Sequence, residues 1–149
     1  MKIVHVIYPF DSELNYQEHY LPLEQSKLGH DVTILTGNRV PKDNQDARVH
    51  ETGMESYRGV KVYRLPTRFS VDSIGIRSHL RDLSPDIIIA HNVLSITSLQ
   101  TTLSELRTDT PIFVDAHIDN DNLFLDALWK QILYKGFRWG SLPLISRRS

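Results

Sequence analysis

The run DIIIA at residues 86–90 is the feature that most restricts the fold. Its three consecutive isoleucines give an extended segment two apolar faces, whereas a strand with one solvated face would alternate apolar and polar residues. Strands buried on both faces belong to parallel sheets that helices cover from the two sides. This short run therefore predicts a layered α/β domain.

The rest of the chain alternates strand and helix patterns, as such a domain requires. Strands are predicted where β-branched and apolar residues cluster, at residues 3–8, 31–36, 59–65, 86–90 and 112–116. Helices are predicted where apolar residues recur at helical spacing, at residues 16–28, 72–83, 95–106 and 122–137. Residues 37–56 are polar and irregular, so a flexible loop is expected there. The predicted fold is a Rossmann-like parallel sheet with helices on both faces.

The first predicted helix carries signals at both ends. Asn15 suits the N-cap, with Glu18 at the capping-box position three residues later. Gly29 suits the residue just past the helix end, where a left-handed backbone is common. Pro22 falls inside the pattern and is expected to bend the chain or to delay the regular part of the helix.

Composition excludes several classes of function. The chain has 149 residues, enough for one domain with a core, and no cysteine, which excludes disulfides, thiolate nucleophiles and cysteine zinc sites. Its net charge of −1 provides no general attraction for nucleic acid. The charge is uneven, however, because residues 128–149 carry +5 and leave −6 for the rest. No stretch approaches the length of about 20 apolar residues that a membrane span needs.

Polar residues follow the predicted strands at the edge where open α/β sheets bind ligands. No glycine lies between Met1 and Leu28, so a dinucleotide site of the GxGxxG type is not expected in the first loop. Asn15, Tyr16 and Gln17 instead supply side-chain donors near a helix N-terminus, which favours an anion. Ordinary helix capping is the alternative interpretation of the same three residues.

His91 and Asn92 directly follow the buried strand of residues 86–90. Two polar side chains at the end of such a strand are expected to face a crevice and to contact a ligand. The alternative is that Asn92 serves as a cap or turn residue for the helix predicted from residue 95.

Asp115, His117 and Asp119 alternate along the last predicted strand end and lie on one face of an extended chain. Carboxylates and imidazole are good ligands for divalent metals, which gives one interpretation. A hydrogen-bonded histidine at a strand end is the second. A histidine that touches substrate and donates or accepts a hydrogen bond near neutral pH is the third.

Five segments, taken in order, resemble the N-terminal domain of glycosyltransferase family 4: KIVHVIYPF, NYQEHYLPLEQSKLGHDVTILTGNR, GVKVYRLP, LSPDIIIAHN and PIFVDAHIDN. LGHDVTILT is the most telling, because this family typically has a Gly-His pair and then an acid and alternating apolar residues between its first helix and second strand. The resemblance spans nearly the whole chain. It implies a GT-B architecture, in which two Rossmann-like domains face each other across a cleft. The N-terminal domain then mainly binds the acceptor, and the C-terminal domain binds a nucleotide-sugar donor.

The resemblance also implies roles for individual residues. The family's histidine at the end of the fifth strand falls on His117, which would contact the donor sugar near the reacting centre and stabilise developing charge. Asp115 and Asp119 would flank it. In a subgroup with Gly-Tyr-Gln-Glu in the first loop, Asn15 stands in the glycine position. The residues predicted to bind substrate are Asn15, Tyr16, Gln17, Glu18, His91, Asn92 and Asp119.

The expected function is that of the acceptor-side domain of a retaining glycosyltransferase, acting on a glycan or lipid-linked acceptor. It needs no cofactor or metal beyond the nucleotide-sugar co-substrate. No counterpart of the donor-binding domain is found in these residues, so the chain is expected to be inactive alone. The rival interpretations are a truncated Rossmann-like binding module without chemistry and a metal-dependent hydrolase that uses Asp115, His117 and Asp119.

The expected location is cytoplasmic, with peripheral contact at the inner face of the membrane. The stretch from Leu128 to Trp139 mixes basic residues with aromatic and aliphatic ones, and such a helix can lie on an anionic membrane surface. The alternative is that the helix packs on the sheet and its aromatic residues belong to the core.

Overall fold

The structure is a computed structural model that describes residues 1–13, 17–42, 45–68, 72–73, 75–91, 101–102 and 110–115. In these ranges the chain forms a six-stranded sheet and two small hairpins. The elements are β1 (Lys2–Val6), α1 (Gln17–Lys27), β2 (Asp31–Gly37), β3 (Arg39–Lys42), β4 (Gln45–Val49), β5 (Gly53–Tyr57), β6 (Val60–Leu65), β7 (Thr67–Arg68), β8 (Asp72–Ser73), α2 (Ile76–Leu83), β9 (Ile87–His91) and β10 (Ile112–Asp115).

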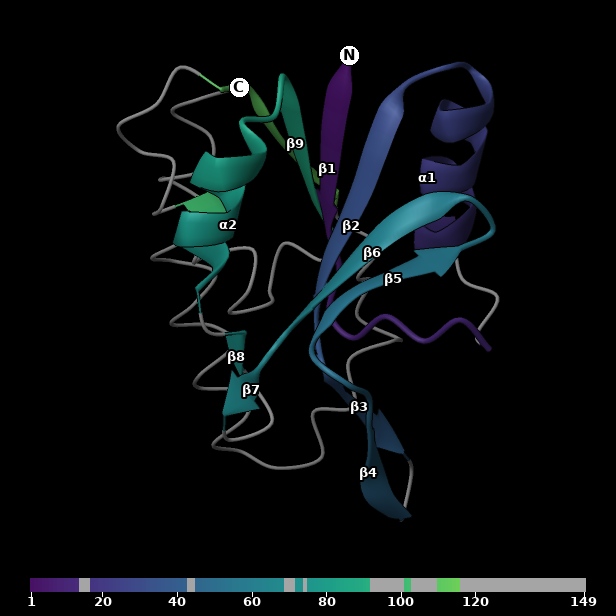
Figure 1. Cartoon of the computed structure of the whole chain (residues 1–149), viewed down its shortest axis with the longest axis vertical. Coiled ribbons are helices and arrows are strands. Elements are labelled where there is room, and N and C mark those ends of the chain that lie inside the picture. The colour runs from purple at the N-terminus through teal and green to yellow at the C-terminus, as the bar shows by residue number, and fades with distance from the viewer. Residues whose placement is uncertain are drawn as a thin grey trace.

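The main sheet has the order β10-β9-β1-β2-β6-β5, and all its neighbouring strands are parallel except β5, which runs antiparallel to β6. Helices α1 and α2 cover opposite faces of this sheet (Figure 1). The predicted Rossmann-like α/β fold is confirmed, and the sheet is mixed rather than purely parallel.

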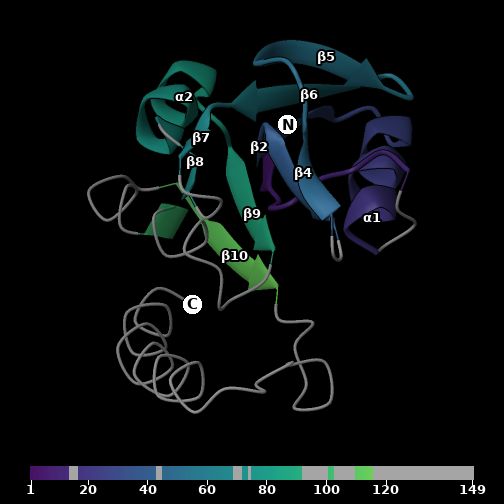
Figure 2. The ribbon, with the colours of Figure 1, turned by 90° about the horizontal axis from the view of Figure 1, so that it is seen from below.

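The order of the strands creates a switch point beside β1. From β1 the chain moves outward through β2 to β6 and then returns to the opposite side of β1 with β9 (Figure 2). In sheets of this kind ligands bind outside the carboxyl ends of the strands, at the point where the order reverses. The ends of β1 and β9 are therefore the first place to look for a site.

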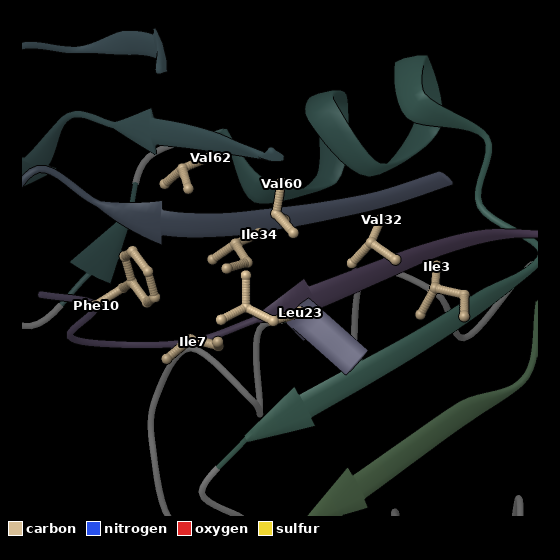
Figure 3. Packing of buried hydrophobic residues seen from close by; sticks show 8 residues of the cluster. All are labelled: Ile3, Ile7, Phe10, Leu23, Val32, Ile34, Val60 and Val62. Atoms are coloured by element: carbon tan, nitrogen blue, oxygen red, sulfur yellow. The ribbon is translucent and has the colours of Figure 1, made fainter. Parts of the chain in front are cut away.

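Two hydrophobic clusters fill the space between the sheet and the helices. The cluster on the α1 side consists of Ile3, Ile7, Phe10, Leu23, Val32, Ile34, Val60 and Val62 (Figure 3). The cluster that contains the α2 residues Ile76 and Leu80 lies on the other face. Strand β9 serves both, since Ile88 belongs to the second cluster and Ile89 packs against the first. This confirms the two-faced burial predicted from the isoleucine run.

Helix α1 ends as predicted. Gly29 has φ of +85° and donates its N–H to the Ser26 carbonyl oxygen, while His30 donates to that of Gln25. This pair of hydrogen bonds is the Schellman arrangement, for which a residue without Cβ is suited. Pro22 lies within the helix and is buried. The proposed N-cap, Asn15, lies outside the described residues.

The prediction of an irregular loop at residues 37–56 was wrong. Strands β3 and β4 form a hairpin in this region, and β5 pairs with β6 at the sheet edge. The turn between β5 and β6 consists of Arg58 and Gly59, both with positive φ, which is the geometry of a two-residue type I′ hairpin. The polar composition of β5 follows from its position, because much of this edge strand is exposed.

The second predicted helix is shorter than expected. Residues 72–73 form β8, and α2 begins only at Ile76, after Gly75 with φ of +89°. Its predicted apolar stripe is confirmed, since Ile76 and Leu80 are buried and Leu83 packs beside them. In the predicted helix at 95–106, residues 101–102 are described and helical. The helix predicted at 122–137 lies outside the described residues.

Candidate functional site

A line of polar side chains crosses the buried face of three neighbouring strands at the switch point. His5 of β1 lies with its Nδ1 2.9 Å from Nε2 of His91 on β9, and its Nε2 is 2.6 Å from Oε1 of Gln25 on α1. On the far side, Nδ1 of His91 lies 3.5 Å from Oδ2 of Asp115 on β10. Four residues from four elements thus form a continuous chain, Gln25–His5–His91–Asp115.

The strand register explains this alignment. His5 lies between Ile3 and Ile7 on β1, and both isoleucines belong to the cluster under α1. His91 and Asp115 are direct partners in the pairing of β9 with β10. Alternation along the strands therefore places all three polar side chains on the α1 face, where Gln25 reaches His5.

Burial fixes the charge of the first histidine. His5 is fully buried, and this burial lowers its pKa to about 4, partly opposed by the Gln25 hydrogen bond and reinforced by the charge of His91. His5 is therefore neutral at pH 7. His91 is 2% exposed, whereas the Asp115 side chain is 31% exposed, so the chain meets solvent at its Asp115 end.

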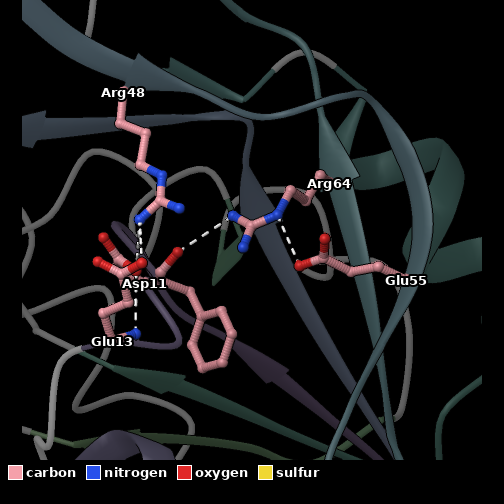
Figure 4. Close-up of polar contacts among 6 residues, drawn as sticks. Asp11, Glu13, Arg48, Glu55 and Arg64 are labelled. Atoms are coloured by element: carbon pink, nitrogen blue, oxygen red, sulfur yellow. Dashed lines mark hydrogen bonds and ion pairs between the residues drawn. The ribbon is translucent and has the colours of Figure 1, made fainter.

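The loop after β1 is fixed by a buried arginine from β6. The side chain of Arg64 is 1% exposed, and its Nε donates to the Glu55 carboxylate at 2.8 Å (Figure 4). Its Nη1 donates to the Phe10 carbonyl oxygen at 3.1 Å, and its guanidinium carbon stands 5.8 Å from the Phe10 ring centre. A buried guanidinium requires such partners, because an unpaired charge in the interior is strongly unfavourable.

A second arginine holds the same loop from β4. Nη1 of Arg48 lies 2.8 Å from the Glu13 carboxylate and 3.8 Å from that of Asp11 (Figure 4). Asp11 is buried and accepts the backbone N–H of Glu13, which closes a local turn. The loop between β1 and α1 is thus held in one conformation up to residue 13, beside the switch point.

Only part of the predicted site falls within the described residues. Asn15, Tyr16, Asn92, His117 and Asp119 lie outside them. Gln17 begins α1, and Glu18 follows it with a half-buried side chain.

His91 differs from the expectation that it faces a crevice. Its side chain is buried, one nitrogen contacts His5 and the other faces Asp115. Its part in ligand binding stays a prediction. Asp115 lies at the partly exposed end of the polar chain, and its expected place beside His117 stays a prediction.

The sequence reasoning missed His5, Gln25 and Arg64. The available signal was a polar residue interrupting an apolar strand pattern, as His5 does in IVHVIY and Arg64 does in VKVYRL. A polar side chain in a strand that is otherwise core must find a partner there. The partner of His5 lies 86 positions away, and no local pattern reveals it.

Two further predictions depend on residues that the structure describes only partly. Across the described ranges, no three histidine or acidic side chains gather in a way that could hold a metal ion. Of the proposed metal ligands, Asp115 alone is in those ranges. No helix in the described part of the chain is long and apolar enough to cross a bilayer.

Comparison with known proteins gives a structural likeness alone. No family model matches the sequence, and no curated protein matches it. Among solved structures, sucrose-phosphate synthase from Thermosynechococcus elongatus is similar, with a TM-score of 0.54 at 12% sequence identity. The match covers 78% of this chain and 33% of the synthase, so the chain spans about a third of that protein's length.

The likeness supports a glycosyltransferase-like fold for this chain. A structural match at 12% sequence identity supports the fold and nothing more specific, so membership of glycosyltransferase family 4 stays a prediction.

Proposed function

We propose that the chain is the acceptor-side domain of a retaining glycosyltransferase, which moves a sugar from a nucleotide-sugar donor to a glycan or a lipid-linked acceptor. The observation that carries the proposal is the shared fold with a region of sucrose-phosphate synthase, which agrees with the order of family-like segments along the sequence. The switch point between β1 and β9 then lies where a Rossmann-like domain binds ligands.

The proposed site lies along the carboxyl edge of the sheet. His117, two residues beyond the end of β10, is proposed to contact the donor sugar and to stabilise charge in the transition state. Asn15, Tyr16, Gln17 and Glu18 follow the anchored loop after β1 and are proposed to bind substrate. His91, Asn92 and Asp119 complete the proposed set.

A second domain is proposed to supply the donor site, so that residues 1–149 bind acceptor without turnover. The reaction needs no resident cofactor, since the nucleotide sugar is itself a substrate. The proposed location is the cytoplasm, at the inner face of the membrane, where lipid-linked acceptors are accessible.

The test begins with the protein isolated from its own cells. Its intact mass is compared with 17.2 kDa, and it is then assayed with a panel of nucleotide sugars and a lipid and glycan extract of the same cells. We expect a larger mass and sugar transfer. His117→Ala should lower kcat by a factor of about 100 or more, because it removes a charge-stabilising contact.

His30→Ala is the matched control, because His30 makes its hydrogen bond at the α1 terminus through its backbone N–H. Transfer that is equally fast in both variants would remove His117 from the proposed mechanism. A native mass of 17.2 kDa together with no transfer from any donor would replace the enzyme proposal with a binding module.

A further inference from the structure

We propose that the predicted helix at residues 122–137, which lies outside the described residues, docks through its apolar side on the α1 face of β9 and β10. This surface is here called the open face, and its described members are Leu21, Ile87, Ile89 and Phe113. The docking completes the layers of the domain, and it does not depend on the proposed function.

The two faces of β9 and β10 differ in burial. On the α2 face, Ile88 is fully buried, and Ile112 packs against the same cluster. On the α1 face, Ile87 and Ile89 are only half-buried, and Phe113, the β10 partner of Ile89, is 59% exposed. Strands that are apolar on both sides need a covering layer on each side. Among the described elements, the α1 face at Phe113 still lacks that layer.

Helix α1 covers the other half of the sheet. It packs on β2 and β6, whereas β10 lies at the opposite end of the strand order (Figure 2). Gln25 marks the flank of α1 that faces β9, because its side chain reaches His5 on β1. Leu21 lies one turn before Gln25 on the same flank and is 40% exposed. The open face is thus bordered by Leu21 on α1 and by Phe113 on the edge strand.

The connection between β9 and β10 belongs to the opposite face. Its described residues, Thr101 and Thr102, are helical and buried. This connection moves across the sheet in the same direction as the one from β6 to β9, which carries α2. Right-handed crossovers that run in one direction place their helices on one face, so residues 101–102 belong with α2. The chain that follows β10 is then the segment left to cover the open face.

The segment that follows β10 has the pattern that the open face needs. Five of its apolar residues recur at helical spacing and form one stripe: Leu125, Leu128, Trp129, Ile132 and Leu133. Four polar residues fall on the opposite side of the same helical pattern: Lys130, Gln131, Lys135 and Arg138. A helix with one apolar stripe of this kind typically buries the stripe against the core of its own domain.

The chain is long enough for this docking. Residues 116–121 lie between the end of β10 and the start of the predicted helix, and a linker of this length can span about 20 Å. A helix is about 10 Å wide, which is close to the width of two strands spaced about 4.8 Å apart. One helix beside α1 therefore covers β9 and β10 and places Phe113 under its apolar stripe.

Docking directs the basic residues of the segment away from the sheet. Lys130, Lys135 and Arg138 then stay available for the proposed contact with an anionic membrane, which becomes electrostatic and needs no apolar insertion. This consequence alone rests on the proposed function.

The experiment measures the accessibility of single cysteines in the 149-residue chain, which has none of its own. Ile132→Cys lies in the apolar stripe, and Gln131→Cys on the opposite side is its matched control. Without lipid, we expect a maleimide reagent to label Ile132→Cys about 10-fold or more slowly than Gln131→Cys, because burial of one large apolar side chain shifts an equilibrium by at least that factor.

Phe113→Asp and Leu21→Asp, each combined with Ile132→Cys, should remove most of this protection. The matched controls are Met54→Asp on β5, at the other edge of the sheet, and Tyr20→Asp on another side of α1. All four substituted residues are at least 40% exposed, so the variants should fold, and thermal unfolding verifies this. Two variants from separate elements keep the test decisive if one of them is unstable.

Equal labelling of Ile132→Cys and Gln131→Cys would overturn the proposal, because the segment would then be undocked. Slow labelling that becomes fast on dilution would replace it with docking between two copies of the chain. Slow labelling that appears only with vesicles would replace it with insertion into the membrane. Protection that survives both Phe113→Asp and Leu21→Asp would contradict docking on the open face. Each outcome is independent of whether the chain transfers sugar.

Discussion

Arg64 contacts Phe10 in two ways: its Nη1 donates a hydrogen bond to the Phe10 carbonyl oxygen at 3.1 Å, and its guanidinium carbon lies 5.8 Å from the centre of the Phe10 ring. A residue near the carboxyl end of β6 thus fixes the backbone that leaves β1. Both positions are fully buried. The loop beside the switch point therefore depends on one charged side chain in the core.

Arg64→Met should lower the free energy of unfolding by about 2–4 kcal/mol. Methionine fills much of the same space, so the loss isolates the hydrogen bond to Phe10 and the pair with Glu55. Urea unfolding followed by fluorescence measures the change. The matched control is Lys61→Met on the same strand, whose exposed pair with Asp31 should contribute no more than about 1 kcal/mol. Equal costs for the two variants would mean that Arg64 does not stabilise the loop.

Gly37→Ala should destabilise the protein by about 1–3 kcal/mol, through crowding alone. A Cβ at this position would lie 2.8 Å from Cε2 of Tyr8 and would also overlap Oγ1 of Thr67. The backbone of Gly37 does not adopt a positive φ, so strain in the main chain adds nothing.

The double variant Gly37→Ala/Thr67→Ala checks this explanation. Removal of Oγ1 relieves one of the two close contacts. The double variant should therefore lose less free energy of unfolding than the two single variants lose together. Strict additivity in thermal unfolding would contradict the crowding argument.

His5 should make stability depend on pH. Its folded-state pKa of about 4 lies below the ordinary 6.5, so between these values the unfolded chain binds the extra proton and the folded chain does not. The free energy of unfolding therefore has its full value above pH 6.5, where His5 is neutral in both states, and it falls as the pH is lowered from 6.5 toward 4. The protein should lose about 2 kcal/mol of unfolding free energy between pH 7 and pH 5 through this group.

His5→Gln measures that contribution, because glutamine keeps polar atoms in the site and does not titrate. Denaturation at several pH values should give a flatter profile for this variant than for the wild-type chain. Parallel profiles would show that His5 is not held neutral by the fold.

The proposed membrane contact gives a separate prediction. Neutralising Lys130, Lys135 and Arg138 to glutamine should weaken binding to anionic vesicles about 100-fold, because each basic residue contributes about 1 kcal/mol near such a surface. Co-sedimentation with phosphatidylserine vesicles provides the measurement. The control neutralises Lys27, Arg77 and Arg81, which are exposed on α1 and α2. Similar losses in both variants would indicate general charge attraction.

The layered fold was predictable because its signals are local. The isoleucines of β9, the apolar stripe of α2 and the glycine that ends α1 each report a preference within a few residues. Strand β5 was not predicted, because the signals that specify it are not local to its own residues. Its sequence GMESY has little apolar character, and its pairing depends on the turn at Arg58 and Gly59 and on the presence of β6.

The polar chain across the sheet could not be predicted in the same way. Its members come from positions 5, 25, 91 and 115, and they meet because β9 inserts beside β1. Sequence reasoning identified His91 and Asp115 from their places at strand ends. It expected His91 to face a crevice and Asp115 to flank His117, since only the register reveals that His91 is shielded by its neighbours.

The central place of β1 has a consequence for how the chain acquires its structure during synthesis. Strand β2 can pair with β1, and β6 with β2, as soon as residue 65 has left the ribosome, whereas the opposite edge of β1 stays unpaired until residues 87–91 emerge. During that interval an apolar strand edge is open to other chains, which is a hazard for aggregation. The nascent chain should therefore be most dependent on chaperones while residues 66–91 are emerging from the ribosome. The contact between His5 and His91 forms only when β9 pairs with β1 and covers this open edge.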